Sequence, residues 1–154
     1  MNPSEATVRR RDFLAWLAAA GLLAACGRDA REPRPGPLAL GQDECAYCRM
    51  TIDDARLAAE FVMPDGRVHK FGEPGCLVAW LRQQGRPAGS AFVADAESAR
   101  WLAAPAAVYV LGSRRTPMLY NVAAFAQRPG DTPPDRVLTW DALLAQGVTN
   151  APRS

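Results

Sequence analysis

Hydrophobic and polar positions in the middle of the chain predict a hairpin followed by a helix. Two strand-like runs, at residues 58–63 and 67–71, are joined by a Pro-Asp-Gly turn signal at 64–66. In the next segment, 74–84, apolar residues recur at helical spacing, a proline opens the segment and a glycine follows it. The pattern therefore predicts two antiparallel strands and a helix with one apolar face.

The second half of the chain alternates between short apolar runs and segments rich in proline and glycine. Three further strands are predicted, at 91–94, 107–111 and 136–139. A short helix or turn is predicted at 97–103, and helices at 121–127 and 140–146. The two halves look alike, so we expect an α+β fold of two ββαβ-like lobes packed as one small domain.

The N-terminal segment has the character of an export signal. Arg10 and Arg11 precede an apolar stretch at 13–25. A membrane-spanning helix needs about 20 apolar residues, and this stretch is shorter. We therefore interpret residues 1–25 as a twin-arginine signal peptide.

Leu23 and the small residues Ala24 and Ala25 precede Cys26, which resembles the bacterial lipobox, whose cysteine carries lipid and becomes the N-terminus. The alternative is an ordinary Ala-x-Ala cleavage site of a soluble protein. Several acyl chains on one residue give a stable anchor, so we expect a membrane-anchored lipoprotein facing the periplasm, or the outer face of the cell membrane. Gly27 favours the outer membrane, because an Asp there would resemble a signal for the inner one.

Residues 26–41 are rich in charges, proline and glycine, and are expected to form a flexible tether. They lead to a predicted folded domain at 42–154. The whole chain has 18 basic and 16 acidic residues, a net charge of +2, so no basic field for nucleic acid is implied. With a single histidine and no catalytic paired-carboxylate pattern that stands out, hydrolytic catalysis is poorly supported, and we expect the protein not to be an enzyme.

The cysteines carry the strongest chemical signal. Apart from Cys26, the chain has Cys45, Cys48 and Cys76, an odd number that cannot pair completely within one chain. Cys45, Cys48 and Met50 place two thiols and a thioether within six residues. Sulfur donors of this kind select the soft ion Cu(I) over hard ions such as Mg²⁺ and Ca²⁺. The sequence therefore predicts a Cu(I) site.

Other interpretations of these residues remain open. The Cys45/Cys48 pair is also compatible with half of a zinc site, a thioredoxin-like redox couple or a structural disulfide. His69, in a predicted strand, is either a satisfied polar residue or a ligand, and Met118 is either core packing or a distant thioether. Cys76 is most simply a buried thiol on an apolar helix face, with ligand or redox status as the alternative.

Together these motifs resemble the NosL family, the copper-binding lipoproteins that assist nitrous-oxide reductase. The resemblance rests on the following residues: Cys26, Cys45, Cys48 and Met50, the Asp65-Gly66 hairpin leading to Phe71 and Gly75-Cys76, and Pro117-Met118 with Phe125. The family often has acidic residues between that Phe and the Gly-Cys pair, whereas this chain has Gly72-Glu73-Pro74. The first acidic position is therefore missing here.

The resemblance implies a fold of two ββαβ lobes and extracytoplasmic Cu(I) binding. It further implies delivery of copper to nitrous-oxide reductase with help from an ABC-transporter-linked periplasmic protein. Our hypothesis is a metallochaperone that holds one Cu(I), per chain or per homodimer, through Cys48, Met50 and Cys45, with His69 or Met118 completing the ligand set. The rival is a membrane-anchored thiol-disulfide oxidoreductase acting on an apo-metalloprotein, which would use Cys45 and Cys48 but not Met50.

Overall fold

The computed structural model describes residues 32–149. The predicted signal peptide at 1–25, the predicted lipidation site Cys26 and the start of the predicted tether lie outside the described residues. Within the described part, no helix combines the length and the apolar character that crossing a membrane would require.

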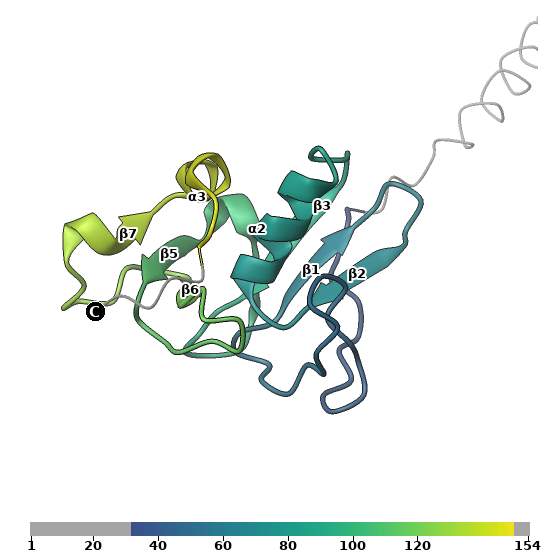
Figure 1. Cartoon of the computed structure of the whole chain (residues 1–154), viewed down its shortest axis with the longest axis horizontal. Helices are drawn as coiled ribbons and strands as arrows, with labels where there is room; N and C mark the ends of the chain where they lie inside the picture. The colour runs from purple at the N-terminus through teal and green to yellow at the C-terminus, as the bar shows by residue number, and fades with distance from the viewer. Residues whose placement is uncertain (1–31, 150–154) are drawn as a thin grey trace, which may run out of the picture. The chain divides into compact units, whose positions relative to one another are not determined.

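The first sheet contains the predicted hairpin. Its four antiparallel strands are β1 (Ala59–Val62), β2 (Val68–Phe71), β3 (Ser90–Ala94) and β4 (Trp101–Ala103), in the order β2-β1-β3-β4. Gly66 has φ 86° in the β1–β2 turn, a conformation that glycine adopts without steric cost. The hairpin prediction is confirmed (Figure 1).

The predicted helix over 74–84 is confirmed as α2 (Pro74–Gln83), which covers one face of this sheet. Pro74 begins the helix, where its missing N–H leaves no hydrogen bond unmade. On the covered face, the ring of Trp80 lies 4.7–5.5 Å from three rings of the hairpin. These are Phe61, His69 and Phe71.

The opposite face of the hairpin is occupied by the segment before the first strand. The Gly36 N–H donates to Glu60 Oε2 at 2.6 Å, and Lys70 Nζ lies 2.7 Å from Asp43 Oδ2. Leu38 packs against the core. The final residues of the predicted flexible tether are therefore held on the folded unit, because Gly36 bonds to the buried Glu60 carboxyl and Leu38 packs on the core.

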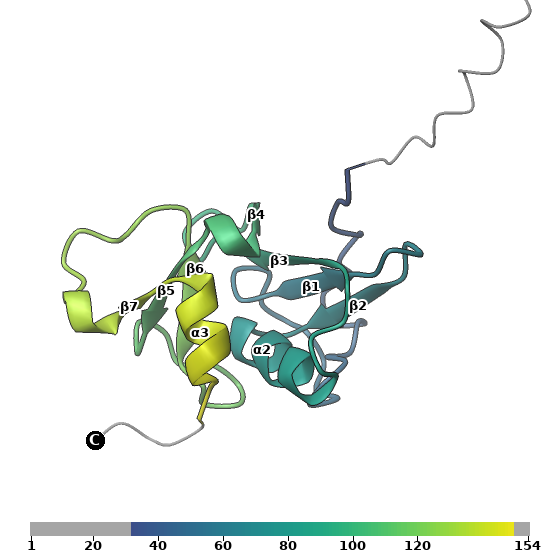
Figure 2. The ribbon, with the colours of Figure 1, turned by 90° about the horizontal axis from the view of Figure 1, so that it is seen from above.

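The second sheet has three strands, β5 (Val108–Leu111), β6 (Val122–Phe125) and β7 (Val137–Leu138), in the order β6-β5-β7. Short 3₁₀ turns, η1 (Ala104–Ala106) and η2 (Pro134–Arg136), precede β5 and β7, and α3 (Trp140–Gln146) follows β7. Figure 2 shows α2 and α3 side by side, in agreement with their contacts.

One local prediction in the second half of the chain is wrong, and another is only partly right. The predicted helix at 121–127 is the strand β6, since all four of its residues are buried and pair with β5. A short apolar run cannot be distinguished from a helix by periodicity alone. The predicted helix or turn at 97–103 is a turn followed by β4.

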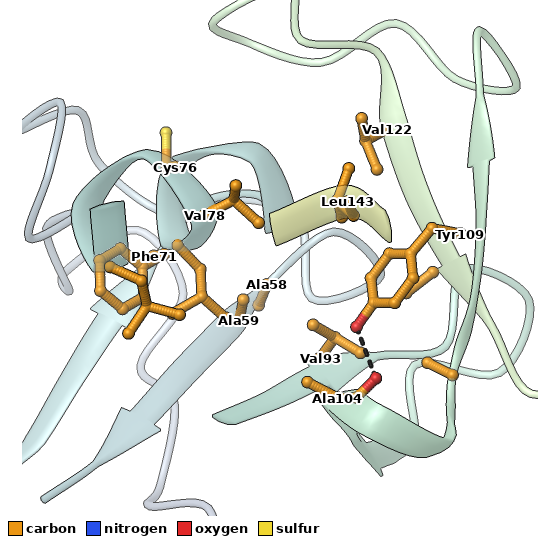
Figure 3. Packing of buried hydrophobic residues seen from close by; sticks show 14 of the residues in the cluster. Ala58, Ala59, Phe71, Cys76, Val78, Val93, Ala104, Tyr109, Val122 and Leu143 are labelled. Carbon is orange, nitrogen blue, oxygen red and sulfur yellow. Dashed lines mark hydrogen bonds between the residues drawn. The ribbon is translucent and has the colours of Figure 1, made fainter. Parts of the chain in front are cut away.

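The two sheets share one core, which confirms the α+β class and the single small domain. Figure 3 shows Val78 and Val93 of the first lobe packed with Tyr109 and Leu143 of the second. The Tyr109 hydroxyl donates to the Ala104 carbonyl oxygen at 2.8 Å. The first lobe is ββαβ with β4 added, whereas in the second lobe the helix follows the strands.

Candidate metal centre

Three cysteines from two parts of the chain converge. The Sγ atoms of Cys45, Cys48 and Cys76 all lie within 4.8 Å of one another. Cys45 and Cys76 are buried, Cys48 is half-buried, and none is in a disulfide. Cys76 belongs to the first turn of α2, and its sulfur projects away from Val78 and the other labelled core residues in Figure 3. The residue predicted most simply as a buried thiol is thus part of the cluster.

The loop that carries Cys45 and Cys48 is closed by its own backbone. The Cys45 N–H donates to the Met50 carbonyl at 2.8 Å, and the Arg49 N–H donates to the Cys45 carbonyl at 2.9 Å. Arg49, directly after Cys48, takes a left-handed conformation with φ 66°, and it ends the turn that contains the two cysteines. The Ala46 N–H donates to the Lys70 carbonyl at 2.7 Å and so attaches the loop to the edge strand β2.

The environment of the cluster favours one thiolate beside two thiols. A hydrogen bond from Cys76 lowers the pKa of Cys45 to about 5, assisted by the backbone N–H groups of Cys48, Gly72 and Tyr47. The thiolate of Cys45 in turn raises the pKa of Cys76, together with burial. Burial is also the main reason that the pKa of Cys48 is raised. The Cys76 thiol and the oriented N–H groups stabilise the anion without a counter-charge, so Cys45 has the thiolate form that a metal ligand requires.

A buried carboxyl lies beside the cluster. Glu73, the N-cap residue of α2, is 1 % exposed. Its Oε1 accepts the Met118 N–H at 2.7 Å, while Oε2 has no hydrogen-bond partner within the described part of the chain. Burial raises the pKa of this carboxyl. The acidic residue in Gly72-Glu73-Pro74, ahead of Gly75-Cys76, could have pointed to this carboxyl, but we predicted no role for Glu73 from the sequence.

Two tyrosines next to the cluster were also missed by the sequence reasoning. Tyr120 packs directly on the start of α2, since a Cβ added at Gly75 would lie 2.4 Å from a Tyr120 ring atom. Burial, followed by the nearby hydroxyl of Tyr47, raises the pKa of Tyr120. Tyr47 lies between Cys45 and Cys48 in the sequence, so its position alone could have predicted that it lies near the cluster.

The other three predicted ligands are placed differently. Met50 is 43 % exposed at the end of the cysteine loop. Met118 is partly buried against the core, with its backbone tied to Glu73. His69 does not join the group of donor atoms found among the described residues, and its ring lies 4.7 Å from that of Trp80. The ligand roles of these three side chains remain predictions.

Three converging sulfurs suit a soft metal ion in a low coordination number. A structural zinc site takes four ligands, and His69, the fourth candidate donor, stands apart from the thiols. Thiolates favour Cu(I), zinc and iron–sulfur clusters. Among the described residues no further His, Cys, Asp or Glu side chain joins the three sulfurs, so the cluster has the donor set of a soft metal ion in low coordination.

The comparison with known families decides the membership of the chain. Residues 38–130, which is more than half of the sequence and contains all three clustered cysteines, match the family description NosL. The chain belongs to the NosL family.

The fold agrees with a solved NosL structure. The crystal structure of the copper chaperone NosL from Shewanella denitrificans superposes with a TM-score of 0.54 at 18 % sequence identity. The match covers 63 % of this chain and 82 % of the Shewanella chain. At this identity the likeness establishes the fold alone. No protein with a curated description matches the chain significantly.

Proposed function

We propose that this NosL-family protein is an extracytoplasmic metallochaperone that binds one Cu(I) ion through its cysteine cluster and passes it on by ligand exchange. The observation that carries the proposal is the convergence of Cys45, Cys48 and Cys76, with all three Sγ atoms within 4.8 Å. Family membership and the copper chaperone of the same fold support it. Copper is here the cargo of the protein.

Each thiol has a distinct part in loading the ion. Cys45 offers a thiolate, since its pKa is lowered to about 5. Cys48 and Cys76 must lose their protons when the metal binds, because thiolates and not thiols are the ligands. Cys48 is the least buried of the three, so it is the ligand that an incoming acceptor reaches first. Met50, exposed on the same loop, supplies a thioether for the transfer step.

We further propose the setting in which the copper is carried. Lipid on Cys26 would anchor the protein to a membrane, and residues 27–35 would let the folded unit reach a partner. The resemblance to NosL supports nitrous-oxide reductase as the recipient and an ABC-transporter-linked periplasmic protein as the assembly partner. Membrane fractionation of cells expressing the protein tests the anchor, since Cys26→Ser should move it to the soluble periplasmic fraction.

An anaerobic Cu(I) titration against a competing chelator tests the copper proposal. The full chain carrying Cys26→Ser is suited to it, because this variant lacks the lipid site and keeps the three clustered cysteines. We expect one tightly held Cu(I) per chain or per dimer, and weaker binding in Cys48→Ser. In Met50→Ala, transfer of the ion to the chelator should slow instead. Ser113→Ala, at an exposed residue of the second lobe, is a control that should bind as the parent does.

One observation favours a second candidate, the thiol-disulfide oxidoreductase. A thiolate at Cys45 with a second sulfur within 4.8 Å is also the arrangement of a redox couple. Turnover of a small disulfide substrate, lost in Cys45→Ser and retained in Met50→Ala, would favour this candidate over the metallochaperone.

A further inference from the structure

The loop at 116–121 reaches from the second lobe to the start of α2. Tyr120 lies very close to Gly75. A Cβ added to Gly75 would be 2.4–2.6 Å from the ring and the Cβ of Tyr120. Real Cβ atoms do not approach other atoms at such distances, so a residue larger than glycine at position 75 would displace Tyr120. Glycine here serves the close approach of two segments.

Glu73 provides a second attachment of the same loop. Its Oε1 accepts the Met118 N–H at 2.7 Å, across 45 positions of sequence. The carboxyl is buried and, with the ring of Tyr120, it brackets the first turn of α2, where Cys76 lies. Two different contacts, one polar and one apolar, therefore hold the loop beside the cysteine cluster.

The loop is also built to keep a fixed shape. Leu119 and Asn121 both have positive φ, at 58° and 53°. The side chains of Thr116 and Asn121 each accept the backbone N–H of the other, at 3.0 and 3.2 Å. Non-glycine residues keep positive φ only where surrounding contacts enforce it, so the loop acts as a preformed unit.

The outer side of the loop faces open space. Pro117 and Leu119 line a groove of about 760 Å³ together with Asp53, Asp54 and Leu57. Leu119 is 37 % exposed. The groove leaves space beside Pro117 and Leu119 into which the loop can shift once its two attachments are released.

From these contacts we propose that Tyr120 and Glu73 are positioning residues that clasp the 116–121 loop against the cysteine cluster and set how fast bound Cu(I) exchanges with an outside acceptor. The inference rests on the proposed copper function and adds a control of release to it. We call the contacts of Tyr120 and Glu73 with the start of α2 and the loop the clasp. While these contacts are made, an acceptor reaches the ion only from the side of Cys48 and Met50. With the clasp displaced, a second approach opens beside Cys76.

The test is the rate of Cu(I) transfer to an excess of a chromogenic chelator, followed anaerobically in the Cys26→Ser full chain. Gly75→Ala displaces Tyr120 without removing a sulfur, and alanine is favoured in helices. We expect about tenfold faster transfer, because losing the contact of Tyr120 with the start of α2 should lower the activation barrier for Cu(I) transfer. Tyr120→Leu should show the same direction. Gly130→Ala is the matched control, since a Cβ there meets no atom within 4 Å.

Two further readouts separate the clasp from a general structural role. The Cu–thiolate charge-transfer absorption and the number of Cu(I) ions bound per chain should be unchanged in both variants. Thermal unfolding of the metal-free protein measures how much stability each variant has lost. Lower stability with transfer at the parent rate in both variants would overturn the clasp. If Gly75→Ala does not fold, the rate in Tyr120→Leu decides alone. Absence of Cu(I) binding by the unsubstituted protein would instead contradict the proposed function itself.

Discussion

Cys45 and Cys76 lie in different parts of the chain, one in the loop before the first strand and the other in the first turn of α2, yet their Sγ atoms are within 4.8 Å. The hydrogen bond from Cys76 is the largest cause of the lowered pKa of Cys45. Cys45 thus contributes a thiolate, and Cys76 contributes a thiol from a helix whose position is fixed by packing on the core. This relationship makes Cys76 an integral part of the proposed centre.

We predict that Cys76→Ser lowers Cu(I) affinity by about a hundredfold, which corresponds to about 2.7 kcal/mol. Serine keeps the size and the helix but offers a poor ligand to a soft ion. Competition with a Cu(I) chelator measures the effect. Ser98→Ala, a change in an exposed turn far from any cysteine in sequence, should leave the affinity unchanged. Equal affinity in Cys76→Ser and the parent would limit the site to the Cys45–Met50 loop.

The pH dependence of copper binding should show the unequal protonation of the three thiols. Since the pKa of Cys45 is lowered to about 5 while those of Cys48 and Cys76 are raised, binding near pH 7 should release about two protons per Cu(I). Affinity therefore rises with pH, and it rises more steeply below pH 5, where Cys45 also becomes protonated. Chelator competition over pH 4.5–8 measures the slope. A slope near zero would show that thiolates do not hold the ion.

Glu60 gives a separate prediction for stability. Burial raises the pKa of its carboxyl, against the opposing effects of Gly36 and Lys70. The folded protein therefore holds this proton more tightly than the unfolded chain, so the contribution of Glu60 is most favourable at low pH and is lost as pH rises through the folded pKa.

Glu60→Gln keeps an oxygen to accept the Gly36 N–H and removes the buried charge. Above pH 6 we expect this variant to melt about 3 °C higher than the parent, and the difference should vanish toward pH 4. Glu97→Gln, at an exposed residue, controls for the loss of one negative charge. A lower melting temperature of Glu60→Gln at every pH would mean that the charged form is stabilised, contrary to this account.

His69 distinguishes packing from metal ligation. Its ring stacks on Trp80 and stands apart from the thiol group, so we predict that His69→Ala changes Cu(I) affinity by less than about threefold, or about 0.6 kcal/mol. It should lower stability by about 1 kcal/mol through the lost aromatic contact. Chelator competition measures the Cu(I) affinity, and unfolding followed by tryptophan fluorescence measures the stability. A tenfold loss of affinity would restore His69 to the ligand set.

The sequence predicted those elements whose signals are local. The β1–β2 hairpin depends on Pro64-Asp65-Gly66, and α2 depends on apolar spacing between Pro74 and Gly85, so both followed from short segments. The strand β6 did not, because four apolar residues in a row suit a buried strand as well as a helix. Its identity comes from pairing with β5, which is remote information.

The candidate site divides in the same way. Cys45, Cys48 and Met50 stand in one motif, so their sulfur chemistry was visible at once. That Cys76 joins the cluster depends on how α2 docks on the hairpin, which no local pattern encodes. Contacts across the two lobes, such as Glu73 with Met118, are determined only by the complete fold.

X-ray absorption of the Cu(I)-loaded protein, prepared anaerobically in the Cys26→Ser full chain, tests the central claim most directly because it counts the sulfur neighbours of the ion. We predict a copper shell of three sulfur atoms that falls to two in Cys76→Ser. A shell dominated by nitrogen or oxygen, or one that Cys76→Ser leaves unchanged, would contradict a Cu(I) centre built from the three cysteines.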